Sequence, residues 1–385
     1  MRLNPNDAAQ ERPAATPSAE DEVRFQEING IGLVTLNRPR QLNALSYPMI
    51  GMLDARLANW AVRHDIAAVV LRGAGPKAFC AGGDIRALYD SFHAGTPLHR
   101  QFFVDEYQLD YRLHGYPKPV VALMDGIVMG GGMGLAQAAH LRVVTERSRV
   151  AMPETGIGLA PDVGASHFLS KLPLALALYV GLTGVTLGAA DTLLCKLADI
   201  VVPATSLEHL EQTLADISWT GDVLADLRAT LQATPAASAQ EAPLQAVLPA
   251  VLRHFRADAS VAGLLDSLAA ESDPAYADWA ARTLDILRGR SPLMMAVTRE
   301  LLLRGRDLDL AGCFRMELGV VSRAFTQGDF IEGVRALIVD KDNAPRWRVK
   351  DASELSEAVV QSFFDSPWPR ESHPLAMLGR SGSTA

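Results

Sequence analysis

Two carboxylates stand eight residues apart in a segment that is otherwise apolar and rich in glycine and proline. They are Glu154 and Asp162, in the run Met152–Gly164 (MPETGIGLAPDVG). Burial raises the pKa of a carboxyl group and nearby amides lower it, so such a pair can divide general-acid and general-base roles. A capping Asp and a surface Glu are the structural alternative, but apolar neighbours such as Ile157 would be unusual in a surface loop. We therefore expect the pair to serve catalysis.

Two glycine-rich segments could hold an anion, Phe79–Asp84 (FCAGGD) and Gly126–Gly134 (GIVMGGGMG). Glycines after a strand let the backbone turn sharply, and a glycine run at a strand–helix junction directs free amides toward one point. Such a point suits a phosphate or an oxyanion formed during acyl transfer. The second segment lacks the Gly-Lys-Ser/Thr of a P-loop and the spacing of a dinucleotide fingerprint. The structural alternatives are an ordinary turn, with Asp84 starting a helix, and close backbone packing.

Other catalytic and metal-binding patterns are missing from the sequence. The run Gly164–His167 (GASH) lacks the closing glycine of a serine-hydrolase elbow, and there is no HExxH pattern. No spacing of Cys and His suggests a metal site, and we expect no metal and no resident cofactor. A structural role is expected for Ser166, His167, Cys80, Cys195 and Cys313.

Composition limits the class of ligand. The 385 residues carry 36 Lys and Arg against 44 Asp and Glu, a formal charge of −8, and 49% of them are hydrophobic. A large core is therefore available, whereas binding to nucleic acid or to an anionic membrane, which needs clustered positive charge, is not expected. The three cysteines fit a reducing compartment, and residues 1–22 contain no apolar signal core. We expect these residues to form a disordered leader and the protein to be cytoplasmic.

Short β-branched runs alternate with helices in the first half of the chain. Strands are expected at Gly32–Asn37, Ala67–Gly73, Pro119–Met124, Leu141–Thr145 and Ala198–Pro203. Between the first two strands, Ser46 can cap a helix with an apolar face. That face consists of Ile50, Leu53, Leu57 and Trp60. Strands separated by helices imply crossover connections and a covered sheet.

After about residue 205 the pattern becomes helical, with Ala336–Val339 the one further strand candidate. Helices are expected at Ser206–Leu231, Leu244–Arg256, Ser260–Ala270, Pro274–Gly289, Pro292–Arg304 and Leu310–Phe325. The uncharged stretch Leu172–Ala190 is interrupted by Pro173 and three glycines, which favours a buried helix and turn over a membrane span. We expect a core over residues 23–204, a helical region over 205–366 and a flexible tail over 367–385.

Taken together, three segments resemble the crotonase, or enoyl-CoA hydratase/isomerase, superfamily. They are AFCAGGD (78–84), KPVVALMDGIVMGGGMGL (118–135) and MPETGIGLAPDVG (152–164). The resemblance implies an α/β fold that binds acyl-CoA, a spiral of repeated ββα units followed here by a C-terminal helical region. It also implies an oxyanion hole in which two peptide N–H groups polarise the thioester carbonyl. By motif position, these donors would be Gly83 and Gly131.

Within the superfamily, longer segments resemble the 3-hydroxyisobutyryl-CoA hydrolases, the thioesterases of valine breakdown. They are MPETGIGLAPDVGASHFLSKLP, SPLMMAVTRELL and DFIEGVRALIVDKDNAPRW, and the resemblance runs from about Val23 to Phe364. It implies hydrolysis of 3-hydroxyisobutyryl-CoA to 3-hydroxyisobutyrate and CoA, with CoA as part of the substrate. Substrate contacts and catalysis map onto Glu106, Gly131, Glu154 and Asp162.

The resemblance also suggests roles for the carboxylates. Glu154 would attack the carbonyl to give a mixed anhydride or activate a water molecule. Asp162 would orient the substrate's 3-hydroxyl or assist departure of the thiolate, and Glu106 would hydrogen-bond the hydroxyl or position water. A buried site that pairs a substrate hydroxyl discriminates against analogues without one.

Two positions separate this sequence from the hydratases of the superfamily. Hydratases carry Glu where this chain has Gly134, and commonly Gly where it has Asp162. Losing one carboxylate and gaining another favours hydrolysis over hydration. Two departures from the hydrolase pattern, Ala160 and Ala165–His167, line or flank the acyl pocket. Hydration or isomerisation of an enoyl-CoA stays open as an alternative, as does non-catalytic acyl-CoA binding, and the family also allows a homo-oligomer.

Overall fold

A computed structural model describes residues 22–233 and 241–380 of the chain. The expected disordered leader, apart from Glu22, lies outside these residues. Glu22 itself is held against the core, because its carboxylate accepts from the Ser46 hydroxyl and lies 3.3 Å from Arg38 Nε.

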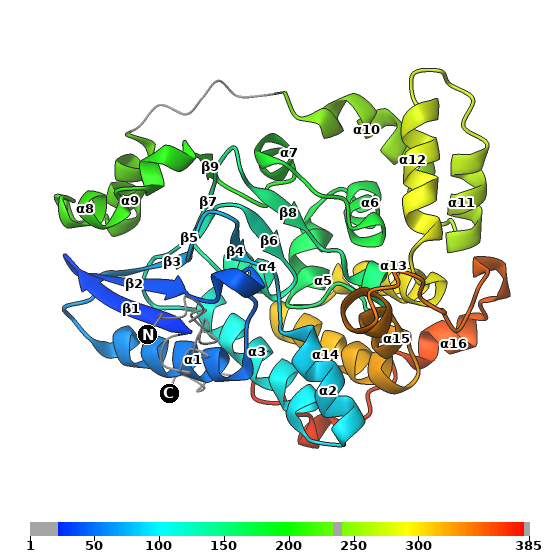
Figure 1. Cartoon of the computed structure of the whole chain (residues 1–385), viewed down its shortest axis with the longest axis horizontal. Coiled ribbons are helices and arrows are strands. Elements are labelled where there is room, and N and C mark those ends of the chain that lie inside the picture. The colour runs from blue at the N-terminus through cyan, green and yellow to red at the C-terminus, as the bar shows by residue number, and fades with distance from the viewer. Residues whose placement is uncertain (1–21, 234–240, 381–385) are drawn as a thin grey trace, which may run out of the picture.

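Two sheets form the centre of the molecule (Figure 1). The larger sheet has the order β1-β2-β3-β5-β7-β9, with β1 antiparallel to β2 and the other neighbours parallel. Its strands are β1 (Val23–Ile28), β2 (Ile31–Leu36), β3 (Ala68–Gly73), β5 (Val120–Met124), β7 (Leu141–Val144) and β9 (Ile200–Val201). The smaller sheet is parallel and contains β4 (Ala78–Cys80), β6 (Ile127–Met129) and β8 (Arg149–Ala151). The five strands expected from the sequence are present. The six-residue strand β1 was not expected, and neither were the three-residue strands of the smaller sheet, which are too short to show a periodic pattern.

Successive turns of the chain give one strand to each sheet and then a helix, which confirms the expected spiral of ββα units. β3 and β4 precede α2 (Ile85–Ala94) and α3 (Leu98–His114). β5 and β6 precede α4 (Gly131–Gln137), and β7 and β8 precede α5 (Ala165–Phe168). Because parallel strands place their carboxyl ends on one side, the loops that follow β4, β6 and β8 lie together.

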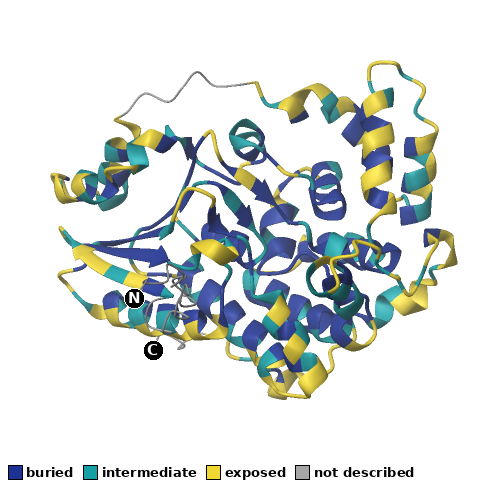
Figure 2. Cartoon of the chain, viewed as in Figure 1, coloured by how far each residue is buried: buried dark blue, intermediate teal, exposed yellow. Residues whose placement is uncertain are grey.

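Two clusters of hydrophobic side chains cover the two faces of the larger sheet. The central strands of this sheet are buried (Figure 2). On one face lie the smaller sheet and α1 (Tyr47–Val62), which buries the four apolar residues that its periodicity predicts. Ser46 caps this helix by accepting from the Met49 N–H, as expected. On the opposite face, α8 (Leu210–Ala215) and α9 (Val223–Gln232) bury leucines against β2, β3, β5 and β7.

The C-terminal region is helical, but one expected helix is divided and the expected strand is wrong. The segment Ser206–Leu231 contains two helices, α8 and α9, because Gly221 adopts a φ of +111° and Asp222 caps α9 by accepting from the Ala225 N–H. Ala336–Val339 lies in a π-helical turn, Arg335–Val339. Ion pairs of Arg335 with neighbours in sequence such as Glu332 favour this local winding over an extended strand.

Five other helices agree with the expected segments to within a few residues at their ends. They are α10 (Pro243–His254), α11 (Val261–Ala269), α12 (Ala277–Arg288), α13 (Pro292–Gly305) and α14 (Leu310–Thr326). The structure adds three short helices that were not expected, α7 (Ala189–Leu194), α15 (Phe330–Val334) and α16 (Glu357–Ser362), and it places α6 at Leu174–Thr183. Helix α6 is the buried helix expected after Pro173, and it ends at Gly184 with a φ of +63°. Among the residues that the structure describes, no helix combines the length and apolar character that crossing a membrane requires. In the segment expected to be a flexible tail, His373 and Leu375 are buried.

Candidate active site

The acidic loop places both of its carboxylates inside the protein. Glu154 begins the 3₁₀ helix Glu154–Ile157 after β8, and Asp162 lies between this turn and α5. Their exposed fractions are only 4% and 5%. Burial and the neighbouring Asp162 raise the pKa of Glu154 well above its usual range, and burial raises the pKa of Asp162 to about 6. Two nearby carboxyl groups thus differ in how readily they ionise, which is the division of roles that acid–base chemistry uses.

The two glycine loops lie next to each other. A β-carbon built on Gly82 would be 3.5 Å from the Gly131 nitrogen, and one on Gly130 would be 3.4 Å from Glu154 Oε1. Gly131 is the first residue of α4, so its N–H is among those without an acceptor inside the helix. The first loop also serves the structural role that was weighed for it, since Asp84 caps α2 by accepting from the Ala87 N–H.

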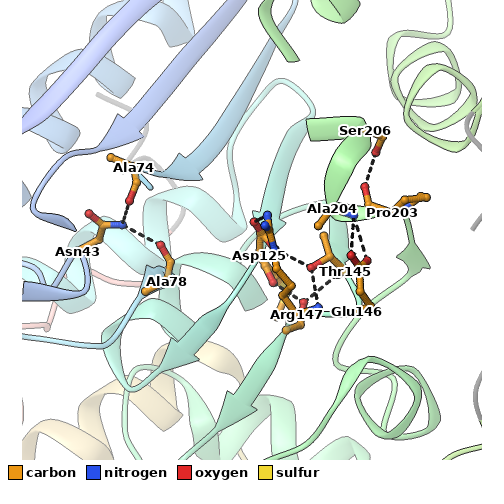
Figure 3. Close-up of polar contacts among 12 residues, drawn as sticks. Asn43, Ala74, Ala78, Asp125, Thr145, Glu146, Arg147, Pro203, Ala204 and Ser206 are labelled. Atoms are coloured by element: carbon orange, nitrogen blue, oxygen red, sulfur yellow. Dashed lines mark hydrogen bonds and ion pairs between the residues drawn. The ribbon is translucent and has the colours of Figure 1, made fainter. Parts of the chain in front are cut away.

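Contacts with residues 42–45 fix the direction of the first glycine loop. Leu45 donates to the Gly82 carbonyl at 2.8 Å and accepts from the Asp84 N–H at 2.9 Å. Leu45 thus bonds to the residues before and after Gly83, as in a parallel β-bridge. The Gly83 N–H, which is opposite the Gly82 carbonyl in the same peptide group, therefore points away from Leu45. The Asn43 amide donates to the carbonyl oxygens of Ala74 and Ala78 and holds the turn between β3 and β4 (Figure 3).

Helix α3 brings Glu106 to the same place. It also brings a second carboxylate, Asp110, which was not among the residues expected from the sequence. Glu106 is 2% exposed and Asp110, one helical turn later, is fully buried. A β-carbon at Gly131 would lie 2.3 Å from Glu106 Oε1, and one at Gly134 would lie 2.4 Å from Asp110 Oδ2. Only glycine at these two positions of α4 allows the carboxyl groups of α3 to approach so closely. Asp110 thus occupies the space beside the residue where hydratases carry a Glu.

The environment disfavours ionisation of the carboxyl groups on α3. Burial, with the charges of Asp110 and Asp162, raises the pKa of Glu106 well above its usual range. Burial also raises the pKa of Asp110, helped by the charges of Asp162 and Glu317. Among the described residues, Glu106 Oε1, Glu154 Oε2 and both oxygens of Asp110 have no hydrogen-bond partner. Buried polar groups are normally paired, so these atoms are available to a ligand or to bound water.

Two further residues hold Asp162 and the loop that follows it, and sequence reasoning missed both. The Tyr107 hydroxyl donates to Asp162 Oδ2 at 2.6 Å. Glu317 of α14, fully buried, accepts from the Gly164 N–H at 2.7 Å, the Ser166 N–H at 2.8 Å and the Ser166 hydroxyl at 2.5 Å. Ser166 therefore has the structural role expected of it. The position of Glu317 among the apolar residues of α14 was the available signal in the sequence. Helical periodicity did not reveal which residues Glu317 contacts.

The structure thus brings the five residues expected to bind substrate or take part in catalysis into one buried part of the protein. Gly83, Gly131, Glu106, Glu154 and Asp162 come from the loops after β4, β6 and β8 and from α3. Within residues 22–233 and 241–380, no group of three or more His, Cys, Asp or Glu side chains is arranged to hold a metal ion. Backbone amides beside unpaired carboxyl groups can polarise a carbonyl, and the carboxyl groups can attack it or move protons.

A sequence model described as enoyl-CoA hydratase/isomerase matches residues 31–364. The chain belongs to the enoyl-CoA hydratase/isomerase family. Its relatives include the mitochondrial 3-hydroxyisobutyryl-CoA hydrolase of Danio rerio, 37% identical over 352 residues that cover 90% of each chain. The 3-hydroxyisobutyryl-CoA hydrolase 1 of Arabidopsis thaliana is 35% identical and covers 91% of this chain and 93% of that one. The family expected from the sequence is confirmed.

Solved structures of this family share the fold over nearly the whole chain. A carnitinyl-CoA dehydratase from Mycobacterium thermoresistibile is 35% identical, with a TM-score of 0.83 and coverage of 94% of this chain and 100% of that one. An enoyl-CoA hydratase from Rhodobacter sphaeroides 2.4.1 is 36% identical, with a TM-score of 0.79 and coverage of 90% and 98%. The names of these family members therefore span hydrolysis, hydration and dehydration of acyl-CoA compounds.

Proposed function

We propose that this protein hydrolyses a short 3-hydroxyacyl-CoA thioester, 3-hydroxyisobutyryl-CoA, to 3-hydroxyisobutyrate and CoA, the thioesterase step of valine breakdown. The observation that carries the proposal is the meeting of two buried, differently ionising carboxyl groups, Glu154 and Asp162, with the adjacent glycine loops. Relatives named as 3-hydroxyisobutyryl-CoA hydrolases, 33–37% identical over about nine-tenths of the chain, support the substrate.

The Gly83 and Gly131 N–H groups are the proposed oxyanion hole. The closeness of Gly82 to the Gly131 nitrogen and the direction of the Gly83 N–H support this assignment. Negative charge develops on the thioester oxygen when the carbonyl carbon is attacked, and each preorganised donor stabilises that charge by about 3 kcal/mol.

Glu154 is the proposed attacking group or general base. Its Oε1 lies beside Gly130, next to the amide that would hold the carbonyl oxygen. Attack by the carboxylate gives a mixed anhydride and expels the CoA thiolate, and water then cleaves the anhydride. Alternatively, Glu154 takes a proton from water as the water attacks. Glu106 then hydrogen-bonds the substrate's 3-hydroxyl or positions water, and Asp162 either orients the 3-hydroxyl or assists departure of the thiolate.

Hydration or isomerisation of an enoyl-CoA is the second candidate, favoured by the solved structures named as a hydratase and a dehydratase. Gly134 argues against it, because no carboxylate projects from that position and Asp110 fills the adjacent space. Non-catalytic acyl-CoA binding is the remaining alternative.

Release of free thiol from a panel of acyl-CoA compounds tests the proposal. We expect turnover of 3-hydroxyisobutyryl-CoA and 3-hydroxypropionyl-CoA, and much slower turnover of isobutyryl-CoA, which lacks the hydroxyl. Hydration of crotonyl-CoA without thiol release would support the second candidate, and binding without turnover would support the third. A single-turnover reaction in ¹⁸O water with excess enzyme separates the two routes of attack, because label in the Glu154 carboxylate requires the anhydride.

Acyl-CoA is the proposed binding partner, and we propose that the protein does not bind nucleic acid. We also propose that the reaction needs no resident cofactor, since CoA is part of the substrate. A homo-oligomer stays a prediction. The cytoplasmic location also stays a prediction, and the relatives named as mitochondrial make fractionation of the source cells its appropriate test.

A further inference from the structure

Helix α3 carries a row of three titratable side chains, Glu106, Asp110 and His114. Their spacing of four residues places them on one helix face, with about 6 Å between successive β-carbons. Glu106 Oε1, both oxygens of Asp110 and His114 Nε2 are buried and have no hydrogen-bond partner in the described part of the chain. A run of unpaired polar atoms in a core is unusual, since such atoms are normally satisfied by protein groups or bound water.

The inner end of this row lies in the candidate active site. Glu106 rests on Gly131 and Asp110 rests on Gly134, beside Val163, the neighbour of Asp162. The charged and titratable groups that act on Asp110 are Glu106, Asp162 and Glu317. All are acidic, and together with burial they raise the pKa of Asp110 and so favour its neutral form, in which one oxygen accepts a proton while the other donates one.

The outer end of the row approaches the surface. Burial and the positive groups nearby lower the pKa of His114 to about 4, so its ring is neutral and can accept a proton on one nitrogen and donate from the other. The groups responsible are His167, Lys171, His140 and Arg142. His140 is exposed and His167 is half-buried.

The proposed reaction creates a need for such a row. Hydrolysis adds water to the thioester and yields a carboxylic acid and a thiol, and at neutral pH the acid ionises. One proton must therefore leave for each turnover, from a site whose acceptors are buried carboxyl groups. This requirement rests on the proposed function.

We propose that Glu106, Asp110 and His114, linked by bound water, form the route by which this proton leaves the active site. Glu106 passes a proton through water to one oxygen of Asp110, whose other oxygen releases its own proton toward His114 Nε2. His114 gives up the proton from Nδ1 to solvent near His140. The three side chains hold the same number of protons after each transfer. They regain their starting forms when the Asp110 carboxyl rotates and the His114 ring exchanges its proton between Nε2 and Nδ1 through water, and no oxidant, metal or further reactant takes part. Asp110 and His114 act through Glu106 and are positioning residues for the proton rather than for the substrate.

The Asp110→Asn variant tests the inner step, because Asn matches the size and neutral charge of a protonated Asp but cannot relay a proton. We expect thiol release in the first turnover at the wild-type rate, followed by a steady-state rate lower by about 10- to 100-fold. Asp191→Asn is the matched control, since Asp191 is a buried Asp of α7 that accepts from the Leu244 N–H. A first turnover as slow as the later ones would overturn the proposal, as would a wild-type steady-state rate.

The His114→Gln variant tests the outer step independently and serves if Asp110→Asn does not fold. Its lowered kcat should rise with added imidazole at constant pH and ionic strength, because the free base replaces the missing ring. His99→Gln, on the same helix and paired with Ser91 in the native chain, should show no such dependence. Absence of imidazole rescue in a folded, slowed His114→Gln variant would overturn the route. Absence of thiol release by the wild type would instead refute the proposed function.

Discussion

Two regions of the site treat their buried carboxyl groups differently. Where α3 meets α4, Glu106 and Asp110 lie against glycine and leave oxygens unpaired among the described residues. Around the acidic loop, Asp162 accepts from Tyr107 of α3, and Glu317 of α14 accepts three hydrogen bonds. Glu317 therefore acts as a structural clamp in the second region, whereas the first region keeps its carboxyl groups free for a ligand, water or a proton.

The difference shows why burial alone does not identify a reactive group. Glu317 is as deeply buried as Asp110, and burial raises the pKa of Glu317 to about 8. Both of its carboxylate oxygens, however, already accept hydrogen bonds from Gly164 and Ser166. A buried acid with saturated partners stabilises one geometry, and an unsaturated one has capacity left for chemistry.

The largest expected effect is the loss of activity in Glu154→Gln. The amide keeps the shape of the side chain but cannot attack the carbonyl or accept a proton, so kcat should fall by about 10²- to 10⁴-fold. Thiol release measures the rate. Urea unfolding should show no loss of stability, because the replaced carboxyl has an unpaired buried oxygen. A stable variant with wild-type kcat would remove Glu154 from the mechanism.

The Glu317→Ala variant should lose stability first and activity as a consequence. Three donors, the N–H groups of Gly164 and Ser166 and the Ser166 hydroxyl, lose a buried acceptor. We expect the free energy of unfolding to fall by about 3 kcal/mol. Urea unfolding measures it, with the exposed Glu357→Ala of α16 as control. If Glu317→Ala is as stable as this control, the two regions do not differ as described.

Gly134→Ala tests the close contact between α3 and α4. The added methyl would lie 2.4 Å from Asp110 Oδ2 and 2.8 Å from the β-carbon of Val163, so buried atoms must move. We expect a destabilisation of about 2 kcal/mol, measured by urea unfolding, together with reduced kcat. Gly51→Ala in α1 is the matched control, because nothing lies within 4 Å of its added methyl and helix propensity should make it slightly stabilising. Equal effects at both sites would contradict the contact.

Stability should depend on pH in a direction set by these carboxyl groups. Burial raises the pKa of Asp162 to about 6 and that of Glu317 to about 8, and it raises the pKa of Asp110 well above its usual range. A folded-state pKa above the unfolded value means that the native state holds more protons, so the contribution of these three groups to stability is complete below about pH 4 and declines as pH rises toward 8. Asp110→Asn should reduce this decline by up to about 1.4 kcal/mol per pH unit. Urea unfolding between pH 5 and 8 measures both slopes, and identical slopes would show that Asp110 is not protonated on folding.

Much of the site could be predicted because its residues lie in short continuous segments. The loops holding Gly83, Gly131, Glu154 and Asp162 each follow a strand, and parallel strands bring such loops to one edge. The division of the expected helix Ser206–Leu231 into α8 and α9 was less predictable, because one periodic pattern of apolar residues runs through the turn at Gly221. The strand expected at Ala336–Val339 failed because four apolar residues cannot distinguish a strand from a helix.

The sequence by itself determined the family, the ββα alternation and the two glycine loops with their acidic partner, because each depends on residues close together in the chain. Only the tertiary structure decided what Asp110, Tyr107 and Glu317 do. Asp110 meets Gly134 across two helices, and Glu317 reaches the loop at Gly164 from 153 residues away. Helical periodicity predicts that such residues face the core, but whether a buried carboxyl finds hydrogen-bond donors depends on the packing of distant elements.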